Sequence, residues 1–202
     1  MSLSEDLLHN GYALFAPNEL MSIHSLLAAC QKPAEPIRRQ KSFIGSLAVS
    51  PALVNETHKL SVERELVGYL GPAPIIKSIE LYRSTSNTER YKSGQLWHMD
   101  IDFALQVKMF FMCRPTTHDN GPFTFISAQD SATVQKATGY IPGKSLDDAY
   151  LQSYSPIELI GDAGSLVFID TSRCLHFGSR CKAGERIALV VQFTQGTSHY
   201  KD

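Results

Sequence analysis

The stretch Ser165–Phe193, SLVFIDTSRCLHFGSRCKAGERIALVVQF, predicts three β-strands in close succession. Apolar and β-branched residues fill the segments 165–170, 174–178 and 186–194, and short polar or glycine-containing turns separate these segments. Many short strands joined by such turns indicate a sandwich or a barrel. The stretch therefore predicts a mainly β fold.

The same pattern of short apolar segments separated by turns extends back to Ile75. Further strands are predicted at 75–83, 95–98, 105–113 and 122–127, and Asp119–Pro122 forms a tight-turn signal before the last of them. Two segments interrupt the pattern. Residues 84–94 are polar and read as a flexible loop, while 128–160 read as an insertion with one helical turn. Loops of this length are often functional lids, and a disordered surface excursion is the alternative.

The residues before Ile75 are predicted to be mostly helical. One helix starts after Asn18, its N-cap, and a second ends at Gly71–Pro72. At 202 residues the chain is about one domain long, which predicts a single domain with a helical part at about 1–72 and a barrel core at about 73–196. The apolar faces of the two helices are formed by Leu20, Ile23, His24 and Leu27, and by Val62, Leu66, Tyr69 and Leu70.

The composition narrows the class of protein. Lys and Arg total 19 against 20 Asp and Glu, and this near-neutral balance argues against nucleic acid as the main partner. No apolar run approaches the roughly 20 residues that cross a bilayer. The first residues lack the basic and apolar regions of a secretory signal, and the four cysteines have no CxxC spacing. A cytoplasmic protein with reduced thiols is expected.

Two histidines and one carboxylate are the candidate metal ligands. In a strand, residues two apart project to the same face, so His98 and Asp100 can present a nitrogen and an oxygen to one point. His176 interrupts an otherwise apolar strand. A lone His-x-Asp is a weak signal, and a lone histidine is more often structural. Together the three match the facial triad of non-haem iron(II) oxygenases. Asp102 is an alternative to Asp100 by alternation alone.

A fourth residue favours the metal hypothesis. Arg186 opens the strand 186–193, where alternation places it with Ala188, Val190 and Gln192 on one face. An arginine on such a face needs an anionic partner, because an unpaired buried charge is very costly. Its planar guanidinium suits bidentate capture of a carboxylate. The alternatives are pairing with a protein carboxylate at the strand edge and exposure to water.

With these residues in place, the sequence resembles the phytanoyl-CoA dioxygenase family of iron(II)/2-oxoglutarate oxygenases. The resemblance rests on Trp97–Asp100, on Asp119–Phe123 between two strands, on Gly161–Asp170 leading into His176, and on Arg186 ten residues later. It covers roughly residues 75–194. The sequence departs from the family where Ile126–Gln129 lacks a Gly-Ser-His motif, and the chain is short for the family.

The resemblance implies a double-stranded β-helix (a jelly-roll, cupin-like fold) with N-terminal α-helices packed on one sheet. It implies that His98, Asp100 and His176 bind Fe(II) and that Arg186 holds the distal carboxylate of 2-oxoglutarate, with Tyr82 beside it. The implied reaction is hydroxylation of a small organic substrate by O2, with release of succinate and CO2. The presence of Asp100 favours hydroxylation over halogenation. The sequence identifies neither the substrate nor the oligomeric state.

Three other polar residues have open roles. Lys108 is unusual on an apolar strand; it pairs with a substrate or co-substrate carboxylate or, as is more common, snorkels at an edge. Arg173 and Arg180 flank His176 near the expected mouth of the barrel, where they meet an anionic substrate or are simply solvated.

Two other functions fit the same residues. A cupin-type hydrolase or isomerase would use His98, Asp100 and His176 with zinc or manganese and a bound water, which leaves Arg186 without a role. A non-catalytic jelly-roll binding module would have no metal affinity at these residues. The hypothesis of an iron- and 2-oxoglutarate-dependent enzyme gives a role to all four residues, the three candidate ligands and Arg186.

Overall fold

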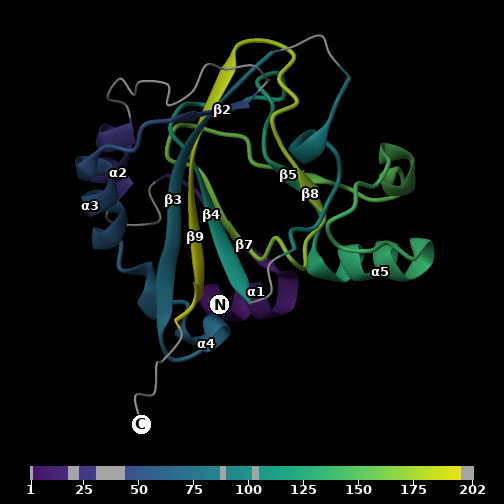
Figure 1. The fold of residues 1–202 in the computed structure, drawn as a ribbon, viewed down its shortest axis with the longest axis horizontal. Helices are drawn as coiled ribbons and strands as arrows, with labels where there is room; N and C mark the ends of the chain where they lie inside the picture. The colour runs from purple at the N-terminus through teal and green to yellow at the C-terminus, as the bar shows by residue number, and fades with distance from the viewer. Residues whose placement is uncertain (1, 18–22, 31–43, 87–89, 102–104, 197–202) are drawn as a thin grey trace.

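The computed structural model describes residues 2–17, 23–30, 44–86, 90–101 and 105–196. Figure 1 shows its helices and strands. The α-helices are α1 (Leu3–Asn10), α2 (Ile23–Cys30), α3 (Pro51–Lys59), α4 (Val67–Leu70) and α5 (Ala128–Thr138), and the 3-10 helices are η1 (Val62–Arg64), η2 (Ser93–Gln95) and η3 (Asp148–Leu151). The strands are β1 (Tyr12–Phe15), β2 (Ile44–Leu47), β3 (Pro74–Thr85), β4 (Gln106–Met112), β5 (Thr124–Phe125), β6 (Ile157–Glu158), β7 (Leu166–Ile169), β8 (His176–Phe177) and β9 (Glu185–Gln195).

Two antiparallel sheets form the centre of the structure. The larger has six strands in the order β1-β7-β4-β9-β3-β2, and the smaller has three in the order β6-β5-β8. The long strands β3 and β9 pair from Pro74↔Gln195 to Thr85↔Glu185. In Figure 1 the short strands β5 and β8 stand to one side of the long strands, with α5 beyond them. A mainly β fold, mostly antiparallel with a few helices, is therefore confirmed.

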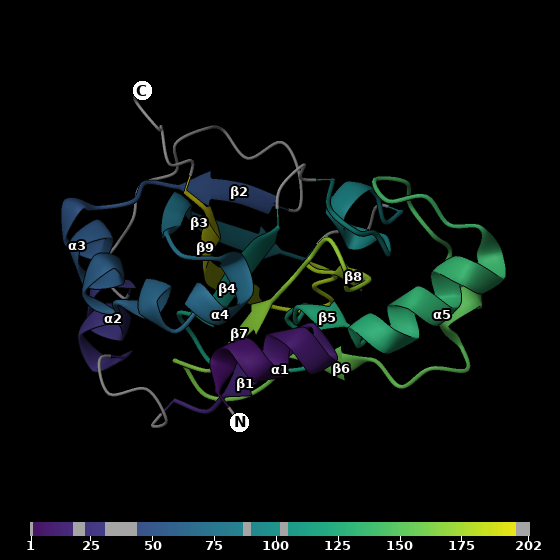
Figure 2. The same cartoon turned by 90° about the horizontal axis from the view of Figure 1, so that it is seen from below.

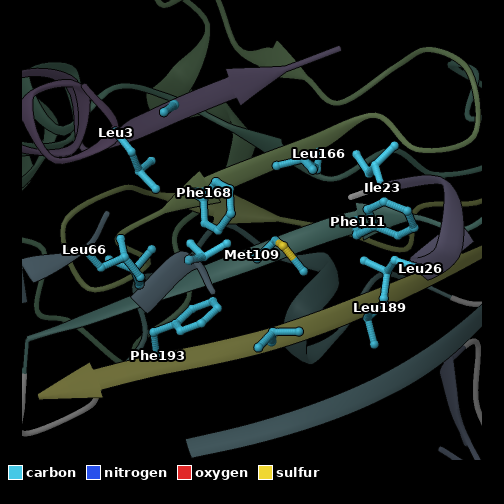
Figure 3. Close-up of a cluster of buried hydrophobic side chains, with 14 of the residues drawn as sticks. Leu3, Ile23, Leu26, Leu66, Met109, Phe111, Leu166, Phe168, Leu189 and Phe193 are labelled. Carbon is cyan, nitrogen blue, oxygen red and sulfur yellow. The ribbon is translucent and has the colours of Figure 1, made fainter. Parts of the chain in front are cut away.

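The N-terminal helices cover one face of the larger sheet, and Figure 2 shows α2, α3 and α4 on the side away from β5 and β8. Their apolar side chains pack on those of β4, β7 and β9 in the largest core cluster, part of which Figure 3 draws. The labelled members are Leu3, Ile23, Leu26, Leu66, Met109, Phe111, Leu166, Phe168, Leu189 and Phe193. The expectation of N-terminal helices packed on one sheet is confirmed.

Strand alternation gives the larger sheet two different faces. On β4, Met109 and Phe111 are fully buried against the helices, whereas Lys108 and Phe110 line a cavity on the opposite face. This face lies toward the smaller sheet. The helix-covered face supplies the largest core cluster, and the other face combines a second apolar cluster with the polar side chains of the cavity.

The segment at about 1–72, which was predicted to be mostly helical, contains strands as well as helices. β1 and β2 lie within it and add edge strands to the larger sheet, pairing with β7 and β3. Where one helix through Val62 and Leu70 was predicted, the structure has η1 followed by α4, with Leu66 at φ −90° and ψ −4° just before α4. The helix containing Ile23 is confirmed as α2. The predicted N-cap Asn18 lies outside the described residues.

Residues 128–160 contain more helix than expected. α5 spans Ala128–Thr138, with the Ser127 hydroxyl accepting from the Asp130 amide at its start and Gly139 in the left-handed conformation at its end. η3 follows at Asp148–Leu151. The insertion is thus a capped helix and a short 3-10 helix packed beside the smaller sheet, not a single helical turn.

A buried polar network ties the N-terminal helices to the turn before β8. The Tyr69 hydroxyl donates to Asp170 at 2.6 Å, and Arg173 donates to the Tyr69 oxygen at 2.9 Å and to the Leu7 carbonyl at 3.1 Å. Burial and the neighbouring Asp170 carboxylate raise the pKa of Tyr69. Arg173 is therefore held by α1 and α4 and does not line the cavity, contrary to both of its expected roles, contact with an anionic substrate and simple solvation.

Tyr69→Phe should lower the free energy of unfolding by about 1–3 kcal/mol, because it removes a buried donor and leaves Asp170 short of a partner. Urea unfolding followed by fluorescence of Trp97, the single tryptophan, measures the change. Tyr150→Phe, at a residue that is 56% exposed, is the matched control and should stay within about 0.5 kcal/mol. A loss at Tyr69 no larger than the control's would contradict the role of the network.

Candidate metal centre

Main-chain hydrogen bonds bring the three predicted ligands together. His98 and His176 face each other in an antiparallel bridge, and each amide donates to the other's carbonyl oxygen at 3.0 Å. The Asp100 amide donates to the Thr171 carbonyl at 2.9 Å, which fixes the residue two positions after His98. The imidazole rings lie 4.3 Å apart, centroid to centroid. The prediction that these residues converge is borne out by the geometry.

The imidazole nitrogens are oriented for ligation. His98 Nδ1 lies 2.8 Å from the Leu96 carbonyl oxygen and His176 Nδ1 lies 2.9 Å from the Cys174 carbonyl oxygen. Each Nδ1 therefore carries the proton, and each Nε2 has its lone pair free for a metal. The two Nε2 atoms lie 3.7 and 3.9 Å from the Asp100 carboxylate oxygens.

Among the described residues, His98, Asp100 and His176 are the one group of three or more ligating side chains of this kind, with all ligand atoms within 4.8 Å of one another. Burial and the neighbouring His98 lower the pKa of His176 to about 4. Burial alone would raise the pKa of Asp100, but the neighbouring His176 and Lys108 lower it to about 2. At neutral pH the site thus offers the neutral imidazole and ionised carboxylate that a divalent ion requires.

Arg186 is buried in the same region with an incomplete set of partners. The side chain is 5% exposed; Nη2 donates to Ser179 Oγ at 2.9 Å and reaches Ser84 Oγ at 3.5 Å. Within the described part of the chain, Nε and Nη1 have no hydrogen-bond partner, and no carboxylate forms an ion pair with the guanidinium. Burial lowers the pKa of Arg186 to about 10, so the group stays cationic at neutral pH.

The chain near Arg186 is shaped around the guanidinium. A Cβ at Gly178 would lie 3.3 Å from both terminal nitrogens, so glycine leaves them room. Ser179 adopts φ 63°, a left-handed conformation that is costly for a residue other than glycine. This backbone places the Ser179 hydroxyl 2.8 Å from that of Ser84, where the pair receives Arg186. The sequence reasoning missed both serines, and the Gly178–Ser179 pair after His176 is their only local signal.

One cavity of about 170 Å³ is lined by the three candidate ligands and by Gly178, Ser179 and Arg186. Its lining joins the ligand cluster to Arg186 across β3, β4 and β9, and Phe110 stacks on Phe123 within it at 3.8 Å between ring centroids. Tyr82 also lines the cavity, and its hydroxyl bonds to Glu80; burial, with this carboxylate, raises the pKa of Tyr82. The cavity lining consists of Ile44, Glu80, Tyr82, Gly94, His98, Asp100, Lys108, Phe110, Phe123, His176, Gly178, Ser179, Arg186, Ala188 and Val190.

Lys108 is in the cavity rather than snorkelling at an edge. Its ammonium donates to Asp100 Oδ2 at 2.7 Å, and its side chain is 21% exposed. The sequence analysis noted Lys108 but preferred the edge position, because nothing in the sequence of β4 indicates that the Asp100 carboxylate lies beside it. Asp102, the alternative ligand, lies outside the described residues.

A larger hollow of about 640 Å³ lies on the other face of the smaller sheet. Trp97 and Phe177 line it, and each is adjacent in sequence to a ligand histidine, so alternation points them away from the metal cluster. Arg180 lies over the Phe177 ring at 3.6 Å and pairs with Asp148 of η3. Arg180 therefore links η3 of the insertion to β8 of the smaller sheet and does not line the metal cavity.

No protein-family model and no curated protein matches this sequence. Solved structures with similar folds do match. SnoN, the non-heme α-ketoglutarate-dependent epimerase from nogalamycin biosynthesis, has a TM-score of 0.61 at 13% identity, covering 96% of this chain and 82% of that one. The non-heme monooxygenase ThoJ has a TM-score of 0.60 at 15% identity, covering 96% and 77%.

A third similar structure is HygX from Streptomyces hygroscopicus, with nickel and 2-oxoglutarate bound. Its TM-score is 0.59 at 12% identity, covering 96% of this chain and 86% of that one. At these identities the comparisons show a shared fold that spans nearly all of the chain. The resemblance to the phytanoyl-CoA dioxygenase family stays a prediction. No described helix has the length and apolar content that crossing a bilayer requires.

Arg186→Met should raise the free energy of unfolding of the ligand-free protein by about 1–4 kcal/mol, because an apolar side chain of similar length replaces a buried cation that lacks an anion. Urea unfolding in a chelating buffer measures it. Arg114→Met, at an exposed arginine paired with Glu185, is the control and should change stability by less than about 1 kcal/mol. If Arg186→Met instead destabilised the protein by more than the control, the hydrogen bonds to the two serines would be enough to stabilise the buried guanidinium without an anion.

Proposed function

We propose that the protein is an Fe(II)- and 2-oxoglutarate-dependent dioxygenase on a double-stranded β-helix, which hydroxylates a small organic substrate and releases succinate and CO2. The observation that carries the proposal is Arg186: a buried guanidinium with two unpartnered donors in the same cavity as a His-Asp-His cluster. A metal site alone does not require such a cation. A metal site together with a dicarboxylate co-substrate does.

The residues fit both groups. His98, Asp100 and His176 supply two nitrogens and one oxygen, the donor set of non-haem iron(II) oxygenases, which leaves positions on the ion for other ligands. Arg186 Nε and Nη1 are donors without a partner among the described residues, so the guanidinium is available to a carboxylate. The similar structures of SnoN, with Fe3+ and α-ketoglutarate, and of HygX, with nickel and 2-oxoglutarate, support this assignment.

The side chains have distinct roles in the proposed reaction. His98, Asp100 and His176 would hold the ion, and Arg186 would hold the distal carboxylate of 2-oxoglutarate with Tyr82 beside it. When bound, iron supplies the activation of O2 that oxidises a C–H bond as 2-oxoglutarate is converted to succinate and CO2. The stacked rings of Phe110 and Phe123 would form an apolar wall beside the reactants. The chain thus binds, orients and shields the reactants.

Hydroxylation is the outcome that we propose among those open to this class. Halogenation would need a vacant ligand position on the ion for a halide. In this chain the Asp100 carboxylate would fill that position. SnoN is an epimerase, so product mass must distinguish the outcomes. A product heavier by one oxygen atom, formed together with succinate, supports hydroxylation, while a product of unchanged mass with succinate release indicates epimerisation.

His98→Ala and Asp100→Ala should abolish the visible charge-transfer band that forms when Fe(II) and 2-oxoglutarate are added anaerobically to the wild-type protein. Each variant removes one of three ligands, which lowers metal affinity sharply. His118→Ala is the matched control, because His118 is 78% exposed and pairs with Glu158 outside the cavity. A band that persists in Asp100→Ala would assign the carboxylate ligand elsewhere.

Arg186→Gln should weaken 2-oxoglutarate binding by about 100-fold, because it removes two charge-assisted hydrogen bonds to one carboxylate. Titration of the Fe(II) protein with 2-oxoglutarate under argon gives the dissociation constant. Arg114→Gln, which changes an exposed arginine, should bind like the wild type. Equal affinity in Arg186→Gln and the wild type would contradict the proposed clamp.

Succinate formation separates the proposed function from a cupin-type hydrolase. The wild-type protein should convert 2-oxoglutarate slowly even without substrate, and only with Fe(II). Activity on an ester or sugar phosphate with zinc or manganese, and none with 2-oxoglutarate, would favour the hydrolase or isomerase instead.

A further inference from the structure

The cavity has a closed end and an open end, and a cation lies at each. Arg186, Ser84 and Ser179 at the first end are at most 5% exposed. The side chains of His98, Asp100 and Lys108 are 21–23% exposed. Among these residues, the side chains around Lys108 are therefore more accessible to a small molecule than Arg186 and its two serine partners.

The strand register separates the two cations. Lys108 of β4 pairs with Gln192 of β9, six residues beyond Arg186 and roughly 20 Å along the strand. The Lys108 side chain reaches back from there to Asp100. The ligand cluster thus lies between Lys108 and Arg186, and a co-substrate that extends from the cluster toward Arg186 leaves Lys108 unoccupied.

The cavity lining contains two cations, Lys108 and Arg186, and two carboxylates, Asp100 and Glu80. Glu80 is exposed and accepts from Tyr82, so among the described residues Asp100 is the carboxylate that pairs with Lys108. A divalent ion and a dianionic co-substrate add no net charge. When Asp100 gives its negative charge to a metal ion, the Lys108 ammonium is left needing another anion, because a partly buried cation without one is unfavourable.

We infer that Lys108 is the substrate-recognising residue of the site and that the substrate is a carboxylic acid whose carboxylate pairs with the Lys108 ammonium at the open end of the cavity. This inference rests on the proposed function. Lys108 thereby holds the carbon chain beside the metal on the side opposite to the co-substrate, so that the position of the carboxylate selects the carbon that reacts.

The test uses the protein loaded with Mn(II) and saturating 2-oxoglutarate, in which no turnover occurs. Mn(II) shortens the proton relaxation times of any small molecule held near it. The probes are the straight-chain carboxylates from acetate to octanoate and their primary amides. At least one carboxylate should bind about tenfold more tightly than its amide, because a charge-assisted hydrogen bond is worth at least that ratio.

Variants assign the preference to Lys108. Lys108→Met should lose the carboxylate preference, Lys108→Arg should keep it, and Lys136→Met, an exposed lysine on α5, should equal the wild type. Lys108→Met should bind Mn(II) at least as tightly as the wild type, because a cation 2.7 Å from a ligand oxygen is gone. This measurement also shows that the variant is folded.

Each outcome bears on one proposal. If the 2-oxoglutarate protons are not relaxed by Mn(II) in the wild type, the proposed function fails. If they are relaxed but no carboxylate binds better than its amide, or Lys108→Met keeps the preference, only the Lys108 inference is overturned. Weaker Mn(II) binding in Lys108→Met also overturns it, because the ammonium would then position Asp100 for the metal.

Discussion

The reciprocal pair of main-chain hydrogen bonds between His98 and His176 is the interaction on which the site depends. It joins two residues 78 positions apart and extends the smaller sheet beyond β8. Because these bonds involve only the backbone, the ligand positions are fixed by strand pairing before any metal binds. The Leu96 and Cys174 carbonyls then set which nitrogen of each ring faces the cluster. The histidines are thus preorganised by the same ladder that builds the sheet.

Stability and function are separated across the larger sheet. Its helix-covered face buries large apolar side chains in the main core. Its cavity face holds a buried guanidinium with two donors that lack partners among the described residues, and Ser179, in the connection after β8, contacts it at φ 63°; both features oppose folding. The apolar clusters on the two faces of the sheet offset these costs. Strain and unsatisfied donors concentrated in one cavity are typical of a binding site rather than of a structural core.

The sequence predicted the parts of the fold whose signal is local. Apolar and β-branched segments between turns located β3, β4, β7 and β9 to within a few residues, and alternation placed Arg186 on one face with Ala188, Val190 and Gln192. β1 and β2 were missed because four-residue edge strands take their stability from β7 and β3 rather than from their own sequence. α5 was missed because its apolar pattern is weak; its Ser127 and Gly139 caps were the available signal.

The role of Lys108 shows what alternation alone cannot decide. Alternation puts Lys108, Phe110 and Met112 on one face of β4, but it does not say that this face lines a cavity. That follows only from the register with β9, which aligns Lys108 with Gln192 and Phe110 with Val190. A shift of one residue would exchange the two faces of β4, exposing Met109 and Phe111 to the cavity and pressing Lys108 into the helices. The apolar core therefore fixes the register, and the register in turn places the cation beside Asp100.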